Sequence, residues 1–386
     1  MSIQFLSANH AAGAAATLAG RANRTGRGFG GGIYPITPQS ECIEYLCNQE
    51  FEKGHFVRVE SEHSAMGVCM GFAFSGARTF TASSSNGLAY MTENVIAAAL
   101  YRLPVVMMAV NRTLGPPWNI WVDHGDTLLL RDAGWTQFYC EDNQEVFDSI
   151  LAGYRLAEDP RILIPCLVCQ DAFVLSHTMM NTEIPDQELV DRFLPALDLP
   201  HRITDRAVTV GGLDFPHETE AHRVQHAQAM DRVWEVYPEV QAEFAAVFGR
   251  PLADPVVPYR MEDARIVLVS MGTTAATVRA AVDEARAKGI PAGSLRVRMF
   301  RPFPERILGE YLAGRPRIAI LDRDISLGHG GVLWSETRGT VRHDCVLQNY
   351  VIGLGGGDIR PQHAAEIIAD IGKRDRIGEP MIMEIG

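Results

Sequence analysis

HFVRVESEHSAMG, residues 55–67, is the stretch of sequence that decides the fold. Apolar and polar residues alternate from His55 to Glu62, as they do along a half-buried strand. From Glu62 to Gly67 the residues are mostly small and are spaced as in a close-packed helix. The sequence therefore places a carboxylate, Glu62, where a predicted strand passes into a predicted helix.

Strand-like and helix-like segments alternate along the following hundred residues. They lie at residues 79–83, 88–99, 103–110, 144–158 and 162–171. This alternation predicts βαβ units, a mainly parallel sheet and hence an α/β fold. Ligands of such sheets bind in the loops at the carboxyl ends of the strands. The loops that we expect to carry function are residues 34–40, 60–64, 83–87, 111–131 and 171–178.

The N-terminal residues predict a helix, a turn and a proline-containing loop. Residues 8–24 are rich in helix formers with small side chains. The glycine-rich residues 25–32 predict a flexible or tightly turned segment. The two prolines of YPITPQS, residues 34–40, exclude a helix interior. We therefore expect a strand end that runs into a loop, followed by a helix from Ser40.

The pattern loosens after residue 177 and then returns. Residues 177–255 contain scattered prolines and one predicted amphipathic helix at 221–248, and we interpret them as an irregular excursion from a first domain at 1–255. A smaller α/β domain is predicted at 262–386, with strands at 264–270, 295–300 and 317–322 and helices between them.

Composition excludes several classes of protein. The 386 residues are 47% apolar, so the chain is neither disordered nor fibrous. The 35 basic and 47 acidic residues give a net charge of −12, which argues against nucleic acid and anionic membranes as partners. No apolar run is long enough for a membrane span, and no signal peptide is recognisable. We expect a cytoplasmic protein.

The cysteines and histidines show no metal or disulfide pattern. The seven cysteines have no recurring spacing, which suits a reducing compartment. Cys166 and Cys169 form a single C-x2-C inside a predicted strand, where their side chains would point to opposite faces. The twelve histidines lack ligand spacing, so we expect no metal site in this chain. GLGGGD, residues 353–358, lacks the lysine and the spacing of a phosphate loop, and we interpret it as a turn between domain elements.

Several motifs in the same order resemble one known family. They are YPITP at 34–38, ESEH at 60–63, NR at 111–112, WNIWVDH at 118–124 and LRVRMFRPFP at 295–304. Together they are similar to the α subunit of 2-oxoacid:ferredoxin oxidoreductases of the pyruvate synthase type. The resemblance covers nearly the whole chain. It implies a thiamine diphosphate-binding, pyrimidine-type parallel-sheet domain followed by a domain like the C-terminal domain of transketolase.

The resemblance also implies an activity and a set of partners. The family oxidatively decarboxylates a 2-oxoacid, here pyruvate as the first expectation, to acyl-CoA and CO₂, and passes the electrons to ferredoxin. Thiamine diphosphate is shared with a β subunit that carries the diphosphate and Mg²⁺ site, and coenzyme A is a co-substrate. Iron–sulfur clusters of the [4Fe-4S] type lie in γ and δ-type subunits. This chain agrees with that division, since it lacks a Gly-Asp-Gly cofactor motif and a run of cluster-ligating cysteines.

The family motifs assign roles to individual residues. Glu62 matches the carboxylate that hydrogen-bonds the aminopyrimidine ring, with Pro35 and Ile36 beside the cofactor; alternatively, Glu62 merely caps the following helix. Arg112 matches the arginine that holds the substrate carboxylate, a group that a guanidinium grips well; alternatively, it is a surface arginine paired with an acid. Thr37 matches a threonine beside the substrate, or is an ordinary turn residue.

Residues 113–132 form an irregular, aromatic segment that we expect to be a wall of the site. Here the chain departs from the pyruvate-type pattern, at TLGPPW, residues 113–118. Gly115, Trp118 and Asn119 are candidate pocket residues. Trp118 either stacks on a bulky substrate or fills core space. Two alternatives therefore remain: an aromatic 2-oxoacid (phenylglyoxylate) dehydrogenase linked to NAD through a flavin subunit, and a non-catalytic assembly subunit.

Overall fold

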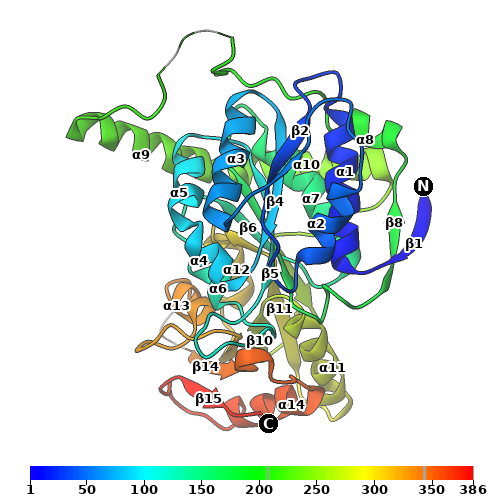
Figure 1. The fold of residues 1–386 in the computed structure, drawn as a ribbon. Coiled ribbons are helices and arrows are strands. Elements are labelled where there is room, and N and C mark those ends of the chain that lie inside the picture. Colours follow the sequence, from blue (N-terminus) through cyan, green and yellow to red (C-terminus); the bar gives the residue numbers. More distant parts are fainter. Residues whose placement is uncertain (206, 208, 342–344, 386) are drawn as a thin grey trace.

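The computed structural model describes every residue except 206, 208, 342–344 and 386. Its main body contains two large sheets flanked by helices, one above the other in Figure 1. The predicted α/β class, with mainly parallel sheets, is confirmed. Among the described residues, no helix combines the length and the apolar character needed to cross a membrane.

The larger sheet has seven strands, six of which are parallel. In spatial order they are β12 (Met299–Arg301), β6 (Thr136–Tyr139), β7 (Cys166–Asp171), β5 (Val106–Asn111), β4 (Arg78–Ser83), β2 (Phe29–Ile33) and β3 (Phe56–Arg58). The register of the central pair runs from Val106 opposite Cys166 to Asn111 opposite Asp171. Only β12, at one edge, is antiparallel to its neighbour.

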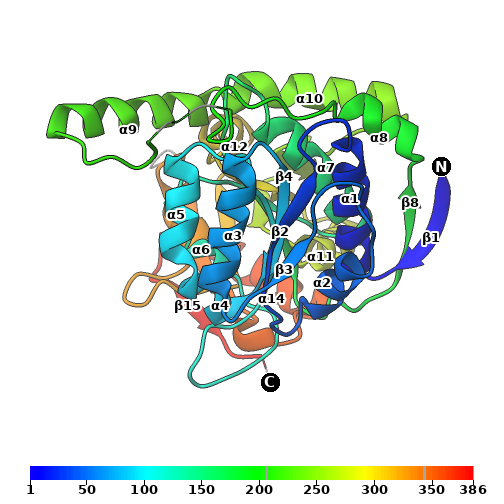
Figure 2. The ribbon, with the colours of Figure 1, turned by 45° about the horizontal axis from the view of Figure 1, so that its top comes forward.

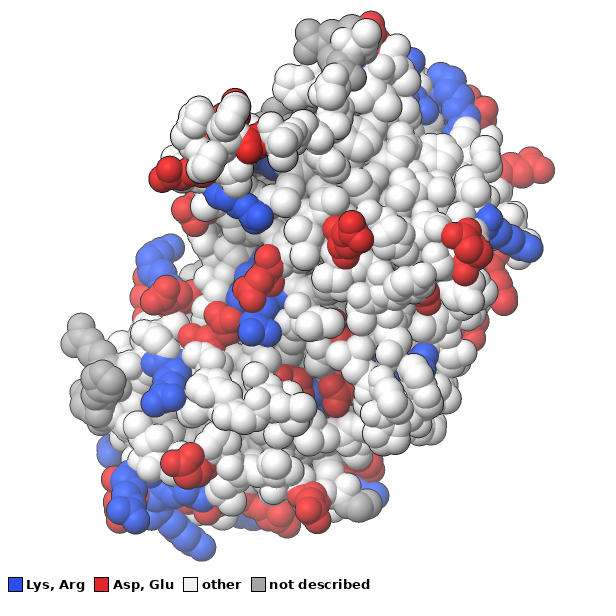
Figure 3. All heavy atoms as spheres, turned by 60° about the vertical axis from the view of Figure 1, so that its left-hand side comes forward, with Lys and Arg blue, Asp and Glu red and all other residues white. Residues whose placement is uncertain are grey.

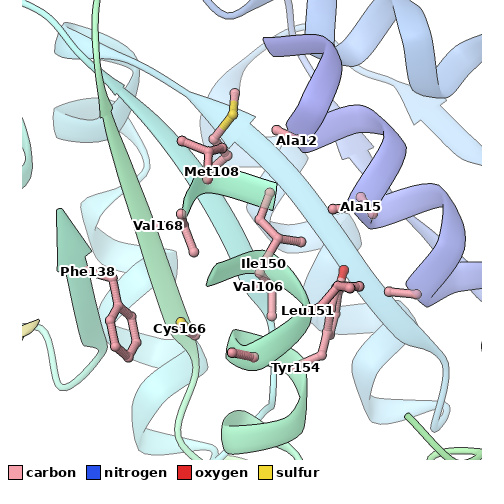
Figure 4. Close-up of a cluster of buried hydrophobic side chains, with 14 of the residues drawn as sticks. Ala12, Ala15, Val106, Met108, Phe138, Ile150, Leu151, Tyr154, Cys166 and Val168 are labelled. Carbon is pink, nitrogen blue, oxygen red and sulfur yellow. The ribbon is translucent and has the colours of Figure 1, made fainter. Parts of the chain in front are cut away.

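Helices cover both faces of this sheet (Figure 2). One side carries α1 (Ala8–Ala22), α2 (Ser40–Cys47), α7 (Asn143–Ala157), α8 (Gln187–Phe193) and α10 (Val233–Phe248). The other side carries α3 (Glu62–Phe74), α4 (Ser85–Tyr90), α5 (Thr92–Leu100) and α6 (Gly125–Leu128). In Figure 4, Ile150 and Tyr154 of α7 lie among Val106, Met108 and Val168 of the central strands. Burial of these apolar side chains stabilises the arrangement.

The second sheet has six strands, of which only β9 is antiparallel. In order they are β15 (Met381–Met383), β14 (Val346–Ile352), β13 (Arg317–Asp322), β10 (Ile266–Ser270), β11 (Ala292–Val297) and β9 (Val256–Tyr259). Helices α11 (Thr274–Ala287) and α14 (Pro361–Ile371) cover one face. Helices α12 (Glu305–Leu312) and α13 (Val332–Arg338) lie on the other face. A short 3₁₀ turn spans Leu354–Gly356.

The two sheets share one hydrophobic core. Met107 and Leu167 of the larger sheet belong to the same buried cluster as Val267, Val269 and Ile320 of the smaller sheet. The sheets are also joined through the chain, because β11 and β12 are separated by a single residue but pair in different sheets. The single strand expected at 295–300 is therefore wrong: it is divided between the two sheets.

The excursion after residue 177 is more regular than the sequence indicated. Strand β8 (Met180–Ile184) pairs antiparallel with β1 (Ser2–Leu6). The single helix expected at 221–248 is two helices, α9 (Pro216–Asp231) and α10, which meet at Arg232. Helix α9 buries only Ala229 and projects from the body in Figure 2.

The glycine-rich segment 25–32 is not simply a flexible entry. Gly30, Gly31 and Gly32 lie in the fully buried strand β2. A Cβ on Gly31 would lie 2.1 Å from the carbonyl oxygen of Phe80, and one on Gly32 would lie 2.2 Å from that of Ala65. Glycine is needed here because strand β4 and helix α3 approach the backbone of β2 too closely for any side chain.

Candidate active site

The candidate residues gather where parallel strands of the larger sheet end. Thr37 and Arg112 lie in the loops that follow β2 and β5. Glu62 and Gly87 lie in the first turns of α3 and α4, the helices that follow β3 and β4. Since these strands are parallel, their carboxyl ends lie at one edge of the sheet, which is where ligands of such sheets bind.

Glu62 is buried at the start of α3 but does not cap it. The cap is Ser61, whose Oγ accepts a hydrogen bond from the Ser64 amide at 3.2 Å. The Glu62 side chain is only 7% exposed. Within the described part of the chain, its carboxylate takes part in no hydrogen bond or ion pair. A carboxylate on a largely buried residue, with no partner among the described residues, is available to a ligand.

Gly87 lets the Glu62 carboxylate and the Ser83 hydroxyl lie close to the backbone of α4. A Cβ at position 87 would lie 2.6 Å from Glu62 Oε1 and 2.5 Å from Ser83 Oγ. The Ser83 hydroxyl is buried and has no hydrogen-bond partner among the described residues. A side chain at position 87 would therefore displace the Glu62 carboxylate. The carboxylate itself fits an aminopyrimidine ring, which could donate an N–H to it.

Arg112 is buried without a carboxylate partner. It is 8% exposed; Nη1 donates to the Thr37 carbonyl at 2.7 Å and Nε donates to the Asn119 carbonyl at 3.0 Å. Burial lowers its pKa from the ordinary arginine value. No ion pair and no hydrogen bond from Nη2 is present within the described residues. The alternative of a surface arginine paired with an acid is therefore wrong.

Thr37 lies directly against Arg112, through its carbonyl rather than its hydroxyl. Thr37 and Pro35 are exposed and Ile36 is half-buried. The loop is braced from below, since Asn9 Nδ2 donates to the Pro38 carbonyl at 2.6 Å. The structure thus brings Thr37 and Arg112 together, and it leaves Thr37 and Pro35 exposed and Ile36 half-buried.

The predicted wall of the site is held at both ends. Asn86 and Gly115 exchange two hydrogen bonds, of 3.2 and 3.1 Å, between the amide side chain and the glycine backbone. A Cβ on Gly115 would lie 2.7 Å from the Trp118 ring, so glycine lets the indole fold back onto the loop. Trp118 is 65% exposed. Its proposed role as a core residue is wrong.

Sequence reasoning missed Asp126, which ties two loops of the site together. Its Oδ2 accepts the amides of Arg112 and Ser85, each at 2.9 Å, and its Oδ1 accepts Asn111 Nδ2 at 3.1 Å. Burial raises its pKa to about 7. The signal was weak, because one aspartate in a loop with several polar residues gives no indication of the strand that it will contact. The loop at 83–87 was singled out, but not Asn86 or Gly87 within it.

Family models match both parts of the chain. The model described as pyruvate flavodoxin/ferredoxin oxidoreductase, thiamine diphosphate-binding, matches residues 31–242. The model for pyruvate:ferredoxin oxidoreductase core domain II matches residues 264–364.

Relatives are similar over most of their length. Pyruvate synthase subunit PorA of Methanocaldococcus jannaschii is 42% identical over 350 residues, 89% of this chain and 90% of the relative. The subunit of the same name in Thermotoga maritima is 42% identical over 345 residues, 87% of this chain and 88% of the relative. Ketoisovalerate oxidoreductase subunit VorA of Pyrococcus horikoshii is 41% identical over 349 residues, 88% of each chain.

Solved structures share the fold at low identity. The 2-oxoglutarate:ferredoxin oxidoreductase of Magnetococcus marinus, solved with 2-oxoglutarate, coenzyme A and succinyl-CoA bound, superposes with a TM-score of 0.74 at 16% identity, covering 95% of this chain and 65% of that chain. Transketolase of Campylobacter jejuni gives a TM-score of 0.55 at 14% identity, covering 95% of this chain and 45% of that chain. The expected likeness to thiamine-dependent folds is confirmed. By its family models and its relatives, this chain belongs to the α-subunit family of the pyruvate and ketoisovalerate oxidoreductases, a group of 2-oxoacid oxidoreductases.

Proposed function

We propose that this chain is the α component of a complex that oxidatively decarboxylates a small 2-oxoacid to its acyl-CoA. In this proposal the chain supplies one side of a thiamine diphosphate site, and a β subunit supplies the diphosphate and Mg²⁺ side. The observation that carries it is the pair of buried, unpaired charges, Glu62 and Arg112, at the loop edge of one sheet. Burying charged groups without partners is costly, so such groups are kept where a ligand uses them.

Glu62 is the residue that we propose holds the cofactor. Its carboxylate would accept a hydrogen bond from the pyrimidine ring. When bound, thiamine diphosphate supplies the nucleophilic carbon and the electron sink that decarboxylation of a 2-oxoacid requires. Burial of the carboxylate strengthens the hydrogen bond, because there is little water to compete with it.

Arg112 is the residue that we propose orients the substrate. Two of its nitrogens are fixed by the carbonyls of Thr37 and Asn119, which leaves Nη2 for an incoming carboxylate. An arginine whose fork is held in this way loses little freedom on binding an anion. Thr37 is exposed and its carbonyl holds Arg112, so its hydroxyl is our candidate for a contact with the 2-oxo group.

The surface beside the site suits a large partner. Exposed apolar residues lie on α4, on α5 and in the segment after Arg112: Tyr90, Ile96, Trp118, Ile120 and Trp121. Figure 3 shows that charged side chains are sparse over much of the face that carries α5. Exposed apolar patches of this kind mark protein interfaces. We propose that the β subunit covers this surface and closes the site, while γ and δ-type subunits carry the iron–sulfur clusters that pass electrons to ferredoxin.

Pyruvate is our first candidate substrate, because relatives named as pyruvate synthase subunits match along nearly the whole chain. A ketoisovalerate oxidoreductase subunit matches almost as well, so a branched 2-oxoacid is the second candidate. Phenylglyoxylate is a third candidate, because the exposed Trp118 ring could stack on an aromatic substrate.

A substrate panel on the purified native complex tests the proposal. Pyruvate, 2-oxoisovalerate, 2-oxoglutarate and phenylglyoxylate are compared with coenzyme A and an artificial electron acceptor. Activity with pyruvate above the others is expected, and activity confined to phenylglyoxylate would overturn the choice of substrate. No activity with any 2-oxoacid would refute the catalytic role. The same preparation identifies the acceptor, since a flavin-containing subunit would point to NAD and not to ferredoxin.

A further inference from the structure

The glycine turn at residues 353–357 reaches across from the second sheet to the wall of the site. The turn follows β14 and contacts the segment at residues 113–124, which we name the wall loop. From its sequence we interpret this turn as a simple connection between domain elements. That interpretation does not explain why the turn contacts the wall loop.

Two side chains of the wall loop clasp the backbone of Gly355. Asn119 Nδ2 donates to the Gly355 carbonyl at 2.7 Å, and the Gly355 amide donates to Asp123 Oδ2 at 3.3 Å. Asn119 is further fixed by its Oδ1, which accepts the Trp121 amide at 2.5 Å. The peptide groups on both sides of one glycine are therefore used to hold the wall loop in a single position.

The conformation of the turn requires glycine. Gly353, Gly355 and Gly356 have φ values of +72°, +63° and +91°, which side-chain-bearing residues rarely adopt. A Cβ on Gly356 would lie 2.1 Å from the Cβ of Trp121. The turn is thus shaped to lie against the wall loop at close range.

A buried arginine supports the turn from behind. Arg323 donates from Nε to the Gly353 carbonyl at 3.3 Å and from Nη2 to the Gly357 carbonyl at 3.1 Å. Its own carbonyl accepts the His124 amide at 3.0 Å, at the far end of the wall loop. The two ends of the turn and one end of the wall loop are therefore fixed to the same residue.

We propose that Asn119 and the 353–357 turn are positioning elements that set the direction of the Arg112 guanidinium. The link is the Asn119 carbonyl, which accepts Arg112 Nε at 3.0 Å while the Asn119 side chain is held by Gly355. The second sheet thereby controls how well the larger sheet binds a 2-oxoacid carboxylate. Because such an anion is gripped in a fixed geometry, a small rotation of the guanidinium weakens binding. This inference depends on the proposed role of Arg112.

Steady-state kinetics of the native complex with two separate variants tests the inference. Asn119→Ala removes the wall-loop side chain that forms the clasp with Gly355. Gly355→Ala disturbs the same clasp from the side of the turn, since the new Cβ would lie 3.3 Å from Asn119 Nδ2. Each is expected to raise the KM for pyruvate about tenfold while the KM for coenzyme A stays constant. Gly314→Ala is the matched control, because Gly314 has a φ of +70° in the same half of the chain but has nothing within 4 Å of a Cβ.

A double variant shows whether Asn119 acts through Arg112. Arg112→Lys combined with Asn119→Ala is expected to raise the KM for pyruvate no further than Arg112→Lys alone, because two residues that act as a unit are not additive. Additive effects, a wild-type KM in both clasp variants, or an equal change in Gly314→Ala would overturn the inference. A wild-type KM in Arg112→Lys would instead refute the proposed role of Arg112.

Discussion

The loop edges of the two sheets have the same architecture but treat their charged groups differently. At the edge of the larger sheet, Glu62 and Arg112 are buried and no ion pair joins them to the described residues. At the edge of the smaller sheet, the buried carboxylates of Asp322 and Asp324 accept backbone amides at the start of α13, including that of Leu333 at 2.7 Å. We interpret the first edge as open for a ligand, whereas the carboxyl oxygens of the second edge serve as hydrogen-bond acceptors for α13.

This difference shows how a ligand-binding edge can be distinguished from a supporting edge in a chain with two similar sheets. Polar residues follow strands in both sheets, and their types alone do not separate a binding edge from a supporting one. The hydrogen-bond partners do: both oxygens of Asp322 and Oδ2 of Asp324 already accept backbone amides. Within this described pair, Asp324 Oδ1 alone has no partner. Four substitutions, from the largest expected effect to the smallest, test the contrast.

The strongest test removes the charge at the open edge. Glu62→Gln in the reconstituted complex is expected to lower kcat by a factor of about 10²–10⁴, because an amide cannot replace a carboxylate in proton transfer at the cofactor. Glu60→Gln is the control, since Glu60 lies at the same strand-to-helix junction but is exposed and bonded to Ser64. Turnover at the wild-type level in Glu62→Gln would contradict the account of this edge.

The second test keeps the positive charge at position 112 but replaces the planar guanidinium with an ammonium group. Arg112→Lys is expected to raise the KM for the 2-oxoacid by about 10–100-fold, since an ammonium lacks the planar fork that holds two carbonyls and still presents Nη2 to the carboxylate. Arg131→Lys, which changes a partly exposed arginine paired with Asp132, should leave the KM unchanged. An equal KM in both variants would show that the guanidinium is not used.

The third test concerns the supporting edge. The buried Asp324 faces Asp322, His124 and Asp123, and burial together with the Asp322 charge raises its pKa well above the usual value; burial raises the pKa of Asp322 to about 6. The folded state therefore binds more protons than the unfolded state, so the stability from this pair is full below about pH 4 and is lost as pH rises through 6.

Asp324→Asn removes the like charge and should reduce this loss. The free energy of unfolding is expected to fall by about 1 kcal/mol less than in the wild type between pH 5 and pH 8, measured by chemical denaturation. The exposed Asp263, whose pKa is lowered by Arg286, is the control, and Asp263→Asn should match the wild type over this range. If the free energy of unfolding of Asp324→Asn fell as steeply with rising pH as that of the wild type, the role assigned to this pair at the supporting edge would be wrong.

The smallest effect is expected at Trp118. Because its indole is mostly exposed, Trp118→Ala should change the free energy of unfolding of this chain by less than about 0.5 kcal/mol. It should, however, change the ratio of kcat/KM between pyruvate and phenylglyoxylate, since the ring lies on the wall of the site. A large loss of stability with an unchanged ratio would assign Trp118 to the fold and not to selectivity.

Much of the larger sheet could be predicted from local patterns, and its contacts could not. The strand-to-helix change at Glu62 is visible in the sequence because periodicity is a local property. Gly30–Gly32 looked like a turn, because glycine is unfavourable in strands unless another backbone comes close, and that approach is made by residues far along the chain. The division of 292–301 between two sheets has no local signal either, since both halves are strand-like.

The same holds for the candidate site: its motifs could be predicted from the sequence, but its long-range contacts could not. Glu62, Arg112 and Thr37 were identified by motif, and the structure places Arg112 against Thr37. The residues that shape the site, Gly87 and Asp126, act through space and not through a recognisable motif. The glycine turn at 353–357 was noticed for its composition, but its contact with Asn119 joins residues more than two hundred positions apart.

The most direct test is an experimental structure of the complete complex with thiamine diphosphate and a 2-oxoacid bound. We expect a pyrimidine nitrogen about 3 Å from the Glu62 carboxylate and the substrate carboxylate on Arg112 Nη2. A cofactor ring bound away from Glu62, or an Arg112 paired with a carboxylate of the β subunit and not with the substrate, would contradict it.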